Sequence, residues 1–271
     1  MRILFLGDVV GRSGRTVISE RLPDLRRNLS IDFVIANGEN AAAGFGITGK
    51  ILTSLFGAGV DVVTGGNHSF DQREIMGAMD GEPRLMRPLN YPADTVGKGA
   101  GVFTAANGKR VGVLNLMGQV FMPILECPYQ TGEKWLATHR LGRECDALVV
   151  DFHGEATAEK MSFAHFVDGR ASLVVGTHTH IPTADQQILP RGTAYMSDAG
   201  MCGDYVSVIG MEKDEPVRRA LKKTPGQRFT PAKGPGTMCG VLIDTDDATG
   251  LTKAVFPIRL GGALAQTPLP A

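Results

Sequence analysis

Short apolar segments alternate with longer amphipathic segments over the first quarter of the chain. The apolar segments have the length of buried strands, and the longer ones carry apolar side chains at helical spacing. Thr48 stands where an N-cap would begin the second helix. Expected strands span residues 2–6, 32–36 and 60–63, and expected helices span residues 15–29 and 48–58. Because strand–helix–strand order requires crossover connections, this region predicts a parallel sheet covered by helices.

Beyond residue 100 the pattern changes to strand pairs joined by short turns. Residues 102–116 predict a hairpin, because Asn107-Gly108 suits a two-residue type I′ turn. The remaining expected elements are strands at 147–151, 172–175, 238–243 and 252–258, a hairpin at 187–197 and a helix at 156–167. Residues 212–236 are rich in proline and predict a surface excursion.

The number of expected strands constrains the architecture further. Roughly ten strands are more than one flat sheet usually holds, so two packed sheets flanked by helices are expected. A chain of 271 residues is long enough for one large α/β domain or two small ones. One α/β domain over residues 1–271 is the expectation.

Composition excludes several classes of protein. Hydrophobic residues make up 43% and charged residues 21%, as in ordinary globular proteins. Basic and acidic residues balance at 28 each, which argues against a surface that wraps nucleic acid, since such binding neutralises many phosphates. A small phosphate-bearing substrate held by local charges stays compatible with this balance.

Targeting signals are also missing from the sequence pattern. The N-terminal segment is too short and too soon acidic for a signal peptide, and no apolar run approaches the roughly 20 residues that span a bilayer. The four cysteines are scattered and predict reduced, structural thiols: Cys127, Cys145, Cys202 and Cys239. The expected location is the cytoplasm, with no membrane partner.

Polar residues with metal-ligating side chains follow five of the expected strands. In parallel α/β sheets the loops at the carboxyl ends of strands converge on the ligand crevice, so residues far apart in sequence meet there. The residues at these strand ends are Asp8, Glu39, Asn40, Asn67, His68, His153, His178 and His180.

Carboxylates, amide oxygens and imidazoles together suit iron, manganese or zinc, and Glu39 could bridge two cations. Each residue alone has an ordinary alternative: Asp8 could cap a helix, and Asn40 could be a turn residue. Five strand ends with the same chemistry favour a metal site. His139 and His165 lack such a context and are interpreted as helix-surface residues.

Two glycine-rich segments imitate nucleotide-binding motifs. Residues 44–50 have the glycine and lysine spacing of a P-loop, but Ile51 stands where a serine or threonine would hold magnesium. Residues 7–14 follow a strand but lack the dinucleotide-binding glycine spacing. Neither segment is interpreted as a nucleotide-binding loop.

The ordered strand-end motifs resemble those of the calcineurin-like metallophosphoesterases, and most closely their YmdB-like branch. The matching blocks are Gly7-Asp8, Gly38-Glu39-Asn40-Ala41, Gly44-Phe45-Gly46-Ile47-Thr48, Gly66-Asn67-His68-Ser69-Phe70-Asp71, His153, Gly176-Thr177-His178-Thr179-His180 and Asp198-Ala199-Gly200-Met201-Cys202-Gly203. These blocks span most of the chain, so the resemblance is specific.

The resemblance implies a four-layer α/β/β/α sandwich of two mixed sheets, with two transition metal ions per chain. Iron is the first expectation, with manganese or zinc as alternatives. By position, one metal would be held by Asp8, Glu39, Asn40 and His180, and the other by Glu39, Asn67, His153 and His178. His68 would be the catalytic partner. The broad superfamily has a histidine where Val10 stands here, and Asn40 would supply the missing ligand.

The resemblance also implies an activity. Two metals roughly 3.5–4 Å apart can lower the pKa of a bridging water, and the resulting hydroxide would attack a phosphodiester, especially a 2′,3′- or 3′,5′-cyclic nucleotide. His68 would donate a proton to the departing oxygen. Two alternatives stay open: a nucleotidase-like phosphomonoesterase, and a non-catalytic metal-dependent regulator that binds nucleotides. A homo-oligomer is compatible with the sequence.

Overall fold

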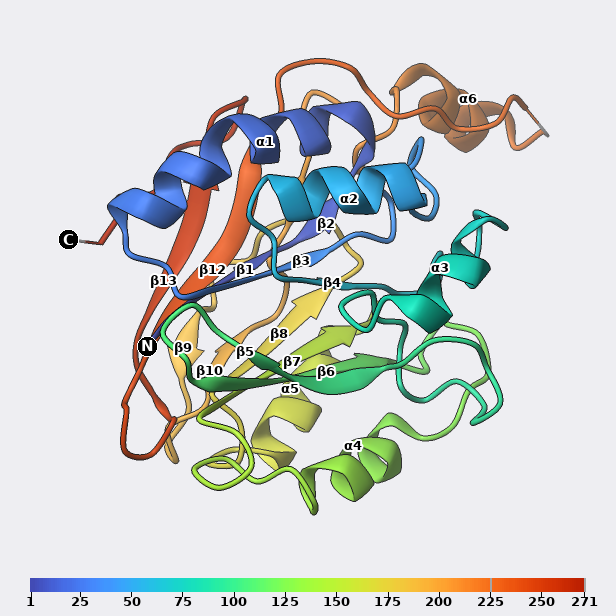
Figure 1. Cartoon of the computed structure of the whole chain (residues 1–271). Helices are drawn as coiled ribbons and strands as arrows, with labels where there is room; N and C mark the ends of the chain where they lie inside the picture. Colours follow the sequence, from blue (N-terminus) through green and yellow to red (C-terminus); the bar gives the residue numbers. More distant parts are fainter. Residues whose placement is uncertain (225, 271) are drawn as a thin grey trace.

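Two β-sheets pack face to face in the computed structural model, which describes residues 1–224 and 226–270 (Figure 1). The first sheet has the order β13 (Thr252–Leu260), β12 (Met238–Thr245), β1 (Arg2–Leu6), β3 (Phe33–Asn37) and β4 (Val62–Thr64). The second has the order β5 (Ala100–Thr104), β6 (Arg110–Met117), β7 (Ala147–His153), β8 (Leu173–Thr177), β10 (Ala194–Met196) and β9 (Gln187–Ile188). A small third sheet pairs β2 (Asp8–Val9) with β11 (Met201–Cys202).

Both large sheets are mixed, with a run of parallel strands and some antiparallel pairs. Strands β1, β3 and β4 run parallel, and so do β6, β7, β8 and β10. In the first sheet β12 lies antiparallel to β1 and β13 antiparallel to β12, while β5 and β9 lie antiparallel at the edges of the second sheet. The carboxyl ends of the parallel strands are where ligand-binding loops are expected.

Alternation along β1 assigns its two faces to two different cores. Ile3 and Phe5 point into the core between the sheets, together with Val113 and Val149 of the second sheet. Successive side chains of a strand point to opposite faces, so Leu4 faces the other way, into the core under the helices. The structure therefore has sheet against sheet at its centre.

Helices cover both outer faces, which gives four layers (Figure 1). Helices α1 (Gly11–Asn28) and α2 (Gly49–Gly57) pack on the first sheet, and α4 (Pro128–Leu136) and α5 (Thr157–Phe166) pack on the second. Thr48 caps α2 as predicted, because its hydroxyl accepts a hydrogen bond from the amide of Ile51 at 3.3 Å. The predicted α/β/β/α sandwich is confirmed.

Several predicted boundaries needed correction. Helix α1 begins at Gly11 rather than residue 15, and β7 and β8 each continue two residues beyond the predicted end, so His153 lies inside β7. The hairpin of β5 and β6 is confirmed, but its turn is not type I′. That turn requires positive φ at two central residues, whereas only Gly108, with φ of 81°, has it, and Asn107 does not.

Residues 212–236 form the expected surface excursion, apart from residue 225, which lies outside the described residues. The excursion contains helix α6 (Asp214–Lys222), which the sequence pattern did not predict, and α6 has no buried residue. In Figure 1, α6 stands away from both sheets, whereas the short helix α3 (Ile75–Gly81) lies close to the end of β4.

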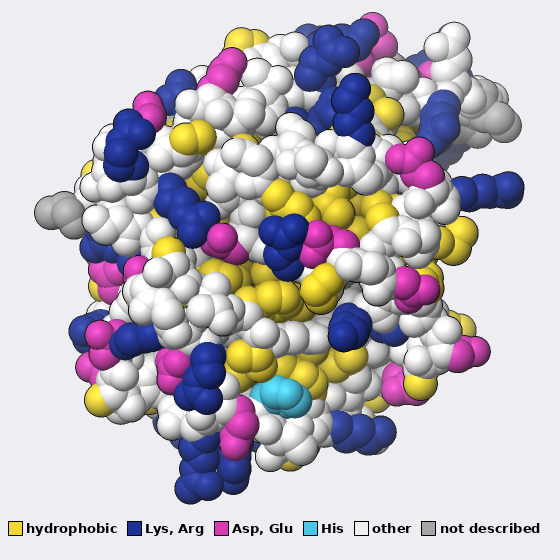
Figure 2. All heavy atoms as spheres, viewed as in Figure 1, with side chains coloured by type: hydrophobic (Ala, Val, Ile, Leu, Met, Phe, Trp, Pro, Cys, Tyr) yellow, Lys and Arg dark blue, Asp and Glu magenta, His cyan; other side chains and the backbone are white. Residues whose placement is uncertain are grey.

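The visible surface agrees with the balanced composition. Basic and acidic side chains are interspersed on the face in Figure 2 rather than gathered into one block. All four cysteines are free thiols, and three of them are buried. Within residues 1–224 and 226–270, no helix has the length and apolar character needed to cross a bilayer.

Candidate metal centre and its pocket

The ends of β1, β3, β4, β7 and β8 meet, and a belt of buried polar side chains lies directly beneath them. The Asp151 carboxylate of β7 accepts hydrogen bonds from Asn37 (3.0 Å), Thr64 (2.5 Å) and Thr177 (2.7 Å). Asn37 and Thr64 belong to the first sheet, and Asp151 and Thr177 to the second. This polar belt therefore fixes the two sheets relative to each other where the candidate ligands project.

His153 lies at the centre of one group of candidate ligands. Its Nε2 is 3.1 Å from a carboxylate oxygen of Glu39 and 2.9 Å from the amide oxygen of Asn67. The His178 ring packs edge-on against it, with ring centroids 4.9 Å apart. Ligand atoms of Glu39, His153 and His178 all lie within 4.8 Å of one another, which is close enough for one metal ion to contact all three.

His180 lies at the centre of a second group. Its Nε2 is 3.2 Å from the amide oxygen of Asn40 and 3.9 Å from a carboxylate oxygen of Asp8. The same Asp8 oxygen is 4.0 Å from His153, so the buried Asp8 carboxylate lies between the two groups. All seven predicted metal ligands therefore lie in two adjacent groups, and four of them line one pocket: Glu39, Asn40, His178 and His180.

The hydrogen bonds around His180 and His153 test whether a cation fits. Nδ1 of His180 lies 2.8 Å from the carbonyl oxygen of Ile209, which can only accept, so Nδ1 carries the proton. Nδ1 of His153 lies 2.9 Å from the hydroxyl of Thr177, whose own hydrogen is donated to Asp151. Nδ1 of His153 therefore carries its proton as well. In the neutral rings both Nε2 lone pairs therefore face oxygen acceptors.

Lone pairs that face carboxylate and amide oxygens repel one another unless a proton or a metal ion lies between them. The orientation of Asn40 is fixed as well, because its amide nitrogen donates to the carbonyl of Gly44 at 3.0 Å. Metal-binding histidines commonly donate their other ring nitrogen to a carbonyl or an acidic group in this way. The residues present thus fit a metal at each of the two groups.

The pKa values of the candidate ligands also indicate a cation site. Burial raises the pKa of Asp8 to about 7, despite the opposing effect of His180. Burial lowers the pKa of His178 to about 3, with help from His153. For His153 burial opposes protonation, but the charge of Glu39 and its hydrogen bond raise the pKa to about 9. The negative charge of Glu39 thus favours a positive charge beside His153, at a position that a cation fits.

Backbone strain marks the segment after β8. His178 has φ of 95° and His180 has φ of 68°, in the left-handed region that side-chain-bearing residues rarely adopt. This conformation turns the two rings apart, His178 toward Glu39 and Glu155, His180 toward Asn40. Strained residues of this kind cluster at functional sites, where surrounding contacts stabilise them.

Close packing around the first group explains the glycine at position 66. A Cβ atom on Gly66 would overlap both the Glu39 carboxylate and the His153 ring. Glycine is therefore required for the loop after β4 to pass so near the ligands, and this loop carries both Asn67 and His68.

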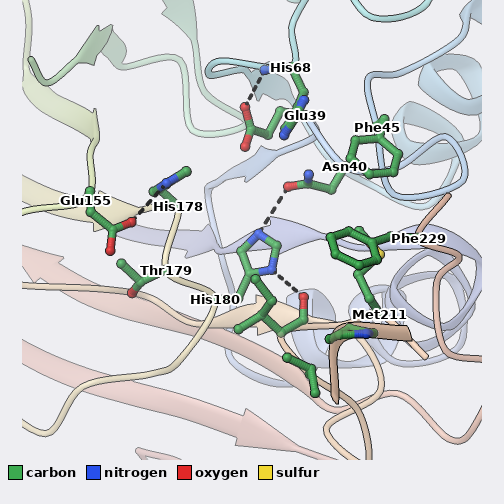
Figure 3. A pocket seen from close by; sticks show the side chains of 13 residues that line it. Glu39, Asn40, Phe45, His68, Glu155, His178, Thr179, His180, Met211 and Phe229 are labelled. Atoms are coloured by element: carbon green, nitrogen blue, oxygen red, sulfur yellow. Dashed lines mark hydrogen bonds and ion pairs between the residues drawn. The ribbon is translucent and has the colours of Figure 1, made fainter. Parts of the chain in front are cut away.

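His68 lines the pocket at the edge of this centre (Figure 3). Its backbone amide donates to Glu39 at 3.0 Å, and its Nδ1 lies 2.8 Å from the carboxylate of Asp71. The ring meets Phe45 edge-on, with centroids 5.2 Å apart. Asp71 thus orients the ring and leaves Nε2 available to a bound molecule.

Three features of the site were not predicted from the sequence. Glu155 lines the pocket and pairs with Nε2 of His178 at 3.1 Å. Asp151 anchors the polar belt, and Phe229 lines the pocket from the distant excursion. Glu155 follows His153 by two residues, a signal that could have been used; the position of Phe229 has no sequence signal.

The two histidines predicted to lie on helix surfaces differ from each other. His165 is exposed on α5, as expected, but His139 follows α4 and stacks on Trp135, with ring centroids 4.3 Å apart.

Comparison with known proteins decides the family. The family model described as YmdB-like protein matches residues 4–258. The chain belongs to the YmdB-like family. It is 46% identical over 249 residues to a 2′,3′-cyclic-nucleotide 2′-phosphodiesterase of Bacillus subtilis (strain 168), covering 92% of this chain and 93% of the relative.

Two solved structures resemble this member of the YmdB-like family closely. A hypothetical protein from Thermus thermophilus superposes with a TM-score of 0.90 at 39% identity, covering 97% of this chain and all of that one (100%). A novel phosphatase from Mycoplasma pneumoniae superposes with a TM-score of 0.88 at 33% identity, covering 96% and 93% of the two chains. The protein is accordingly a metallophosphoesterase that hydrolyses small phosphoesters.

Proposed function

We propose that this enzyme hydrolyses cyclic nucleotides, 2′,3′-cyclic phosphodiesters first and 3′,5′-cyclic phosphodiesters second, with two transition metal ions. The observation that carries the metal requirement is the pair of imidazole Nε2 lone pairs that face only oxygen acceptors, on His153 and His180. The 2′,3′-cyclic specificity rests on the Bacillus relative at 46% identity.

The proposed ligands follow the two groups. Asp8, Asn40 and His180 would hold one ion, Asn67, His153 and His178 the other, and Glu39 would contact both. Iron is the proposed metal, with manganese or zinc as alternatives, because mixed oxygen and imidazole ligands suit all three. When bound, the pair of ions polarises the phosphoryl oxygens and makes water more acidic.

The chain itself supplies the remaining chemistry. Asp8 and Glu39 place negative charge where cations and the substrate phosphate meet, which limits the net charge of the site. His68, oriented by Asp71 at 2.8 Å, donates a proton from Nε2 to the ribose oxygen that leaves phosphorus. Burial directly above the polar belt keeps the ligands in place without rearrangement during the reaction.

Metal-depleted protein reconstituted with iron, manganese or zinc tests this proposal. We expect turnover of adenosine 2′,3′-cyclic phosphate only after reconstitution, with about two ions bound per chain at full activity. Comparing kcat/KM for the 2′,3′-cyclic, 3′,5′-cyclic and 3′-monophosphate forms of adenosine ranks the substrates. Full activity in metal-free protein contradicts the metal centre.

A phosphomonoesterase is the second candidate, favoured by the resemblance to the phosphatase from Mycoplasma pneumoniae at 33% identity. A higher kcat/KM for the 3′-monophosphate than for the cyclic diester would establish it. The non-catalytic regulator would bind the nucleotides without turnover in the same assay.

A further inference from the structure

The pocket beside the metal centre has two chemically different sides. It encloses about 430 Å³, within the range of sites that bind small ligands. One side carries the polar groups of Glu155, His178 and Thr179, and the opposite side carries Phe45, Phe229 and Met211 (Figure 3). A phosphate at the metal centre would therefore have an apolar surface next to it.

Phe229 presents an aromatic face to this pocket. The Arg219 guanidinium lies over the ring, 4.1 Å from its centroid, and Arg219 is itself held by a 2.8 Å bond to Glu215. The ring is only half-buried and lines the cavity. An aromatic ring stabilised on one face and open to a cavity is suited to stacking a flat ligand.

Phe45 continues the same apolar side toward the reacting centre. Its loop is fixed by the hydrogen bond from Asn40 to the carbonyl of Gly44, so a proposed metal ligand also positions this ring. The ring contacts His68 at 5.2 Å between centroids, and the Arg228 guanidinium lies 5.2 Å from its centroid. Phe45 thus lies directly next to the proposed proton donor.

We propose that Phe45 and Phe229 form a nucleobase subsite; this inference rests on the proposed function. The ribose oxygen that leaves phosphorus must lie near His68, so the nucleoside extends from the phosphate on the His68 side of the pocket. Phe45 is the next side chain there, and the wall continues to Phe229. A base stacked on this wall lies one ribose away from the phosphate, with the polar Glu155 side opposite.

The subsite selects phosphodiesters that carry a base over those that do not. The test compares two substrates with the same cyclic diester: adenosine 2′,3′-cyclic phosphate and methyl riboside 2′,3′-cyclic phosphate, which has no base. For Phe229→Ala and Phe45→Ala in the metal-loaded enzyme, we expect kcat/KM to fall roughly 5- to 100-fold on the nucleotide, mainly through KM. On the baseless substrate, Phe229→Ala keeps the wild-type kcat/KM, whereas Phe45→Ala loses some activity, though less than on the nucleotide, because its ring also contacts His68. Phe229→Trp restores the nucleotide preference.

Phe166→Ala is the matched control. Phe166 is also a part-exposed aromatic (42% exposed) with an arginine over its ring, Arg170 at 5.1 Å, but it lies on α5 outside the pocket. We expect Phe166→Ala to keep the wild-type kcat/KM on both substrates.

A binding measurement separates failure of the subsite from failure of the proposed function. If wild-type enzyme turns over neither cyclic diester, the proposed function is wrong, and calorimetry with adenosine 3′-monophosphate still tests the subsite through weaker binding to Phe229→Ala. If both alanine variants lose activity equally on the two substrates, or bind the nucleotide as tightly as wild type, the subsite is wrong.

Discussion

The floor of the pocket and its apolar wall are built in opposite ways. Floor residues such as Glu39 and His153 are buried at strand ends and held by the polar belt, whereas Phe229 comes from an excursion whose helix α6 buries no residue. Metal chemistry tolerates only small displacements of its ligands, so it needs such rigid support. Recognition of a flat base needs only a surface, which an exposed segment can supply.

Removing a floor ligand should have the largest effect. We expect His153→Ala to lose metal and to lower kcat/KM roughly a thousandfold or more, because bound metal contributes several kcal/mol to transition-state stabilisation. Elemental analysis and turnover of a cyclic nucleotide check both effects. His139→Ala is the control, because His139 lies outside the pocket. Normal metal content in His153→Ala would show that His153 is not a ligand, and the proposed difference between floor and wall would be wrong.

Removing the proposed proton donor should affect chemistry but not metal. For His68→Ala we expect kcat to fall roughly 10²–10⁴-fold on a cyclic nucleotide, with metal occupancy unchanged. The deficit should shrink on a diester with a nitrophenolate leaving group, which departs without a proton. Loss of metal from this variant would assign His68 to the floor as a ligand, and full activity would exclude the donor role.

Weakening the support of a ligand should have the smallest effect. Thr177→Val removes the hydroxyl that accepts from His153 and donates to Asp151, so we expect metal affinity to fall roughly 10–100-fold. A competition titration with a chelating dye measures this change. Thr252→Val removes a buried hydroxyl far from the pocket, bonded to Ser172, and should leave the affinity unchanged. Equal losses in both variants would mean that the polar belt has no special role.

The contrast between the floor and the apolar wall also separates what the sequence could predict from what it could not. Short apolar strands and the polar residues after them predicted the two sheets and the neighbourhood of Asp8, Glu39 and His180, because local pattern determines both. Glycine at 66 beside Asn67 marked the tight loop. Such features depend on residues adjacent in sequence, where steric rules act directly.

Features that depend on distant contacts were not predictable. Helix α6 carries Val217 and Leu221 at helical spacing, but both side chains are exposed, and the prolines of this excursion indicated a loop instead. Asp151 looked like the last residue of a buried strand, and its partners Asn37 and Thr64 lie in the other sheet. Asn107 lies in a five-residue connection whose length is set by the register of β5 against β6. This register, and not the local preference of Asn-Gly for a type I′ turn, determines the turn.

The polar belt also has a consequence for the order of folding. Asn37 and Asp151 are 114 positions apart, and His180 is 140 positions from Asn40. Closing such long loops is entropically costly and slow, so these contacts form only when the two sheets dock. The unfolded chain and either isolated sheet lack the complete ligand set. A bound ion therefore raises the free energy of unfolding by an amount that grows with the logarithm of the ion concentration. Metal supply thus helps to determine which fraction of the chain is folded.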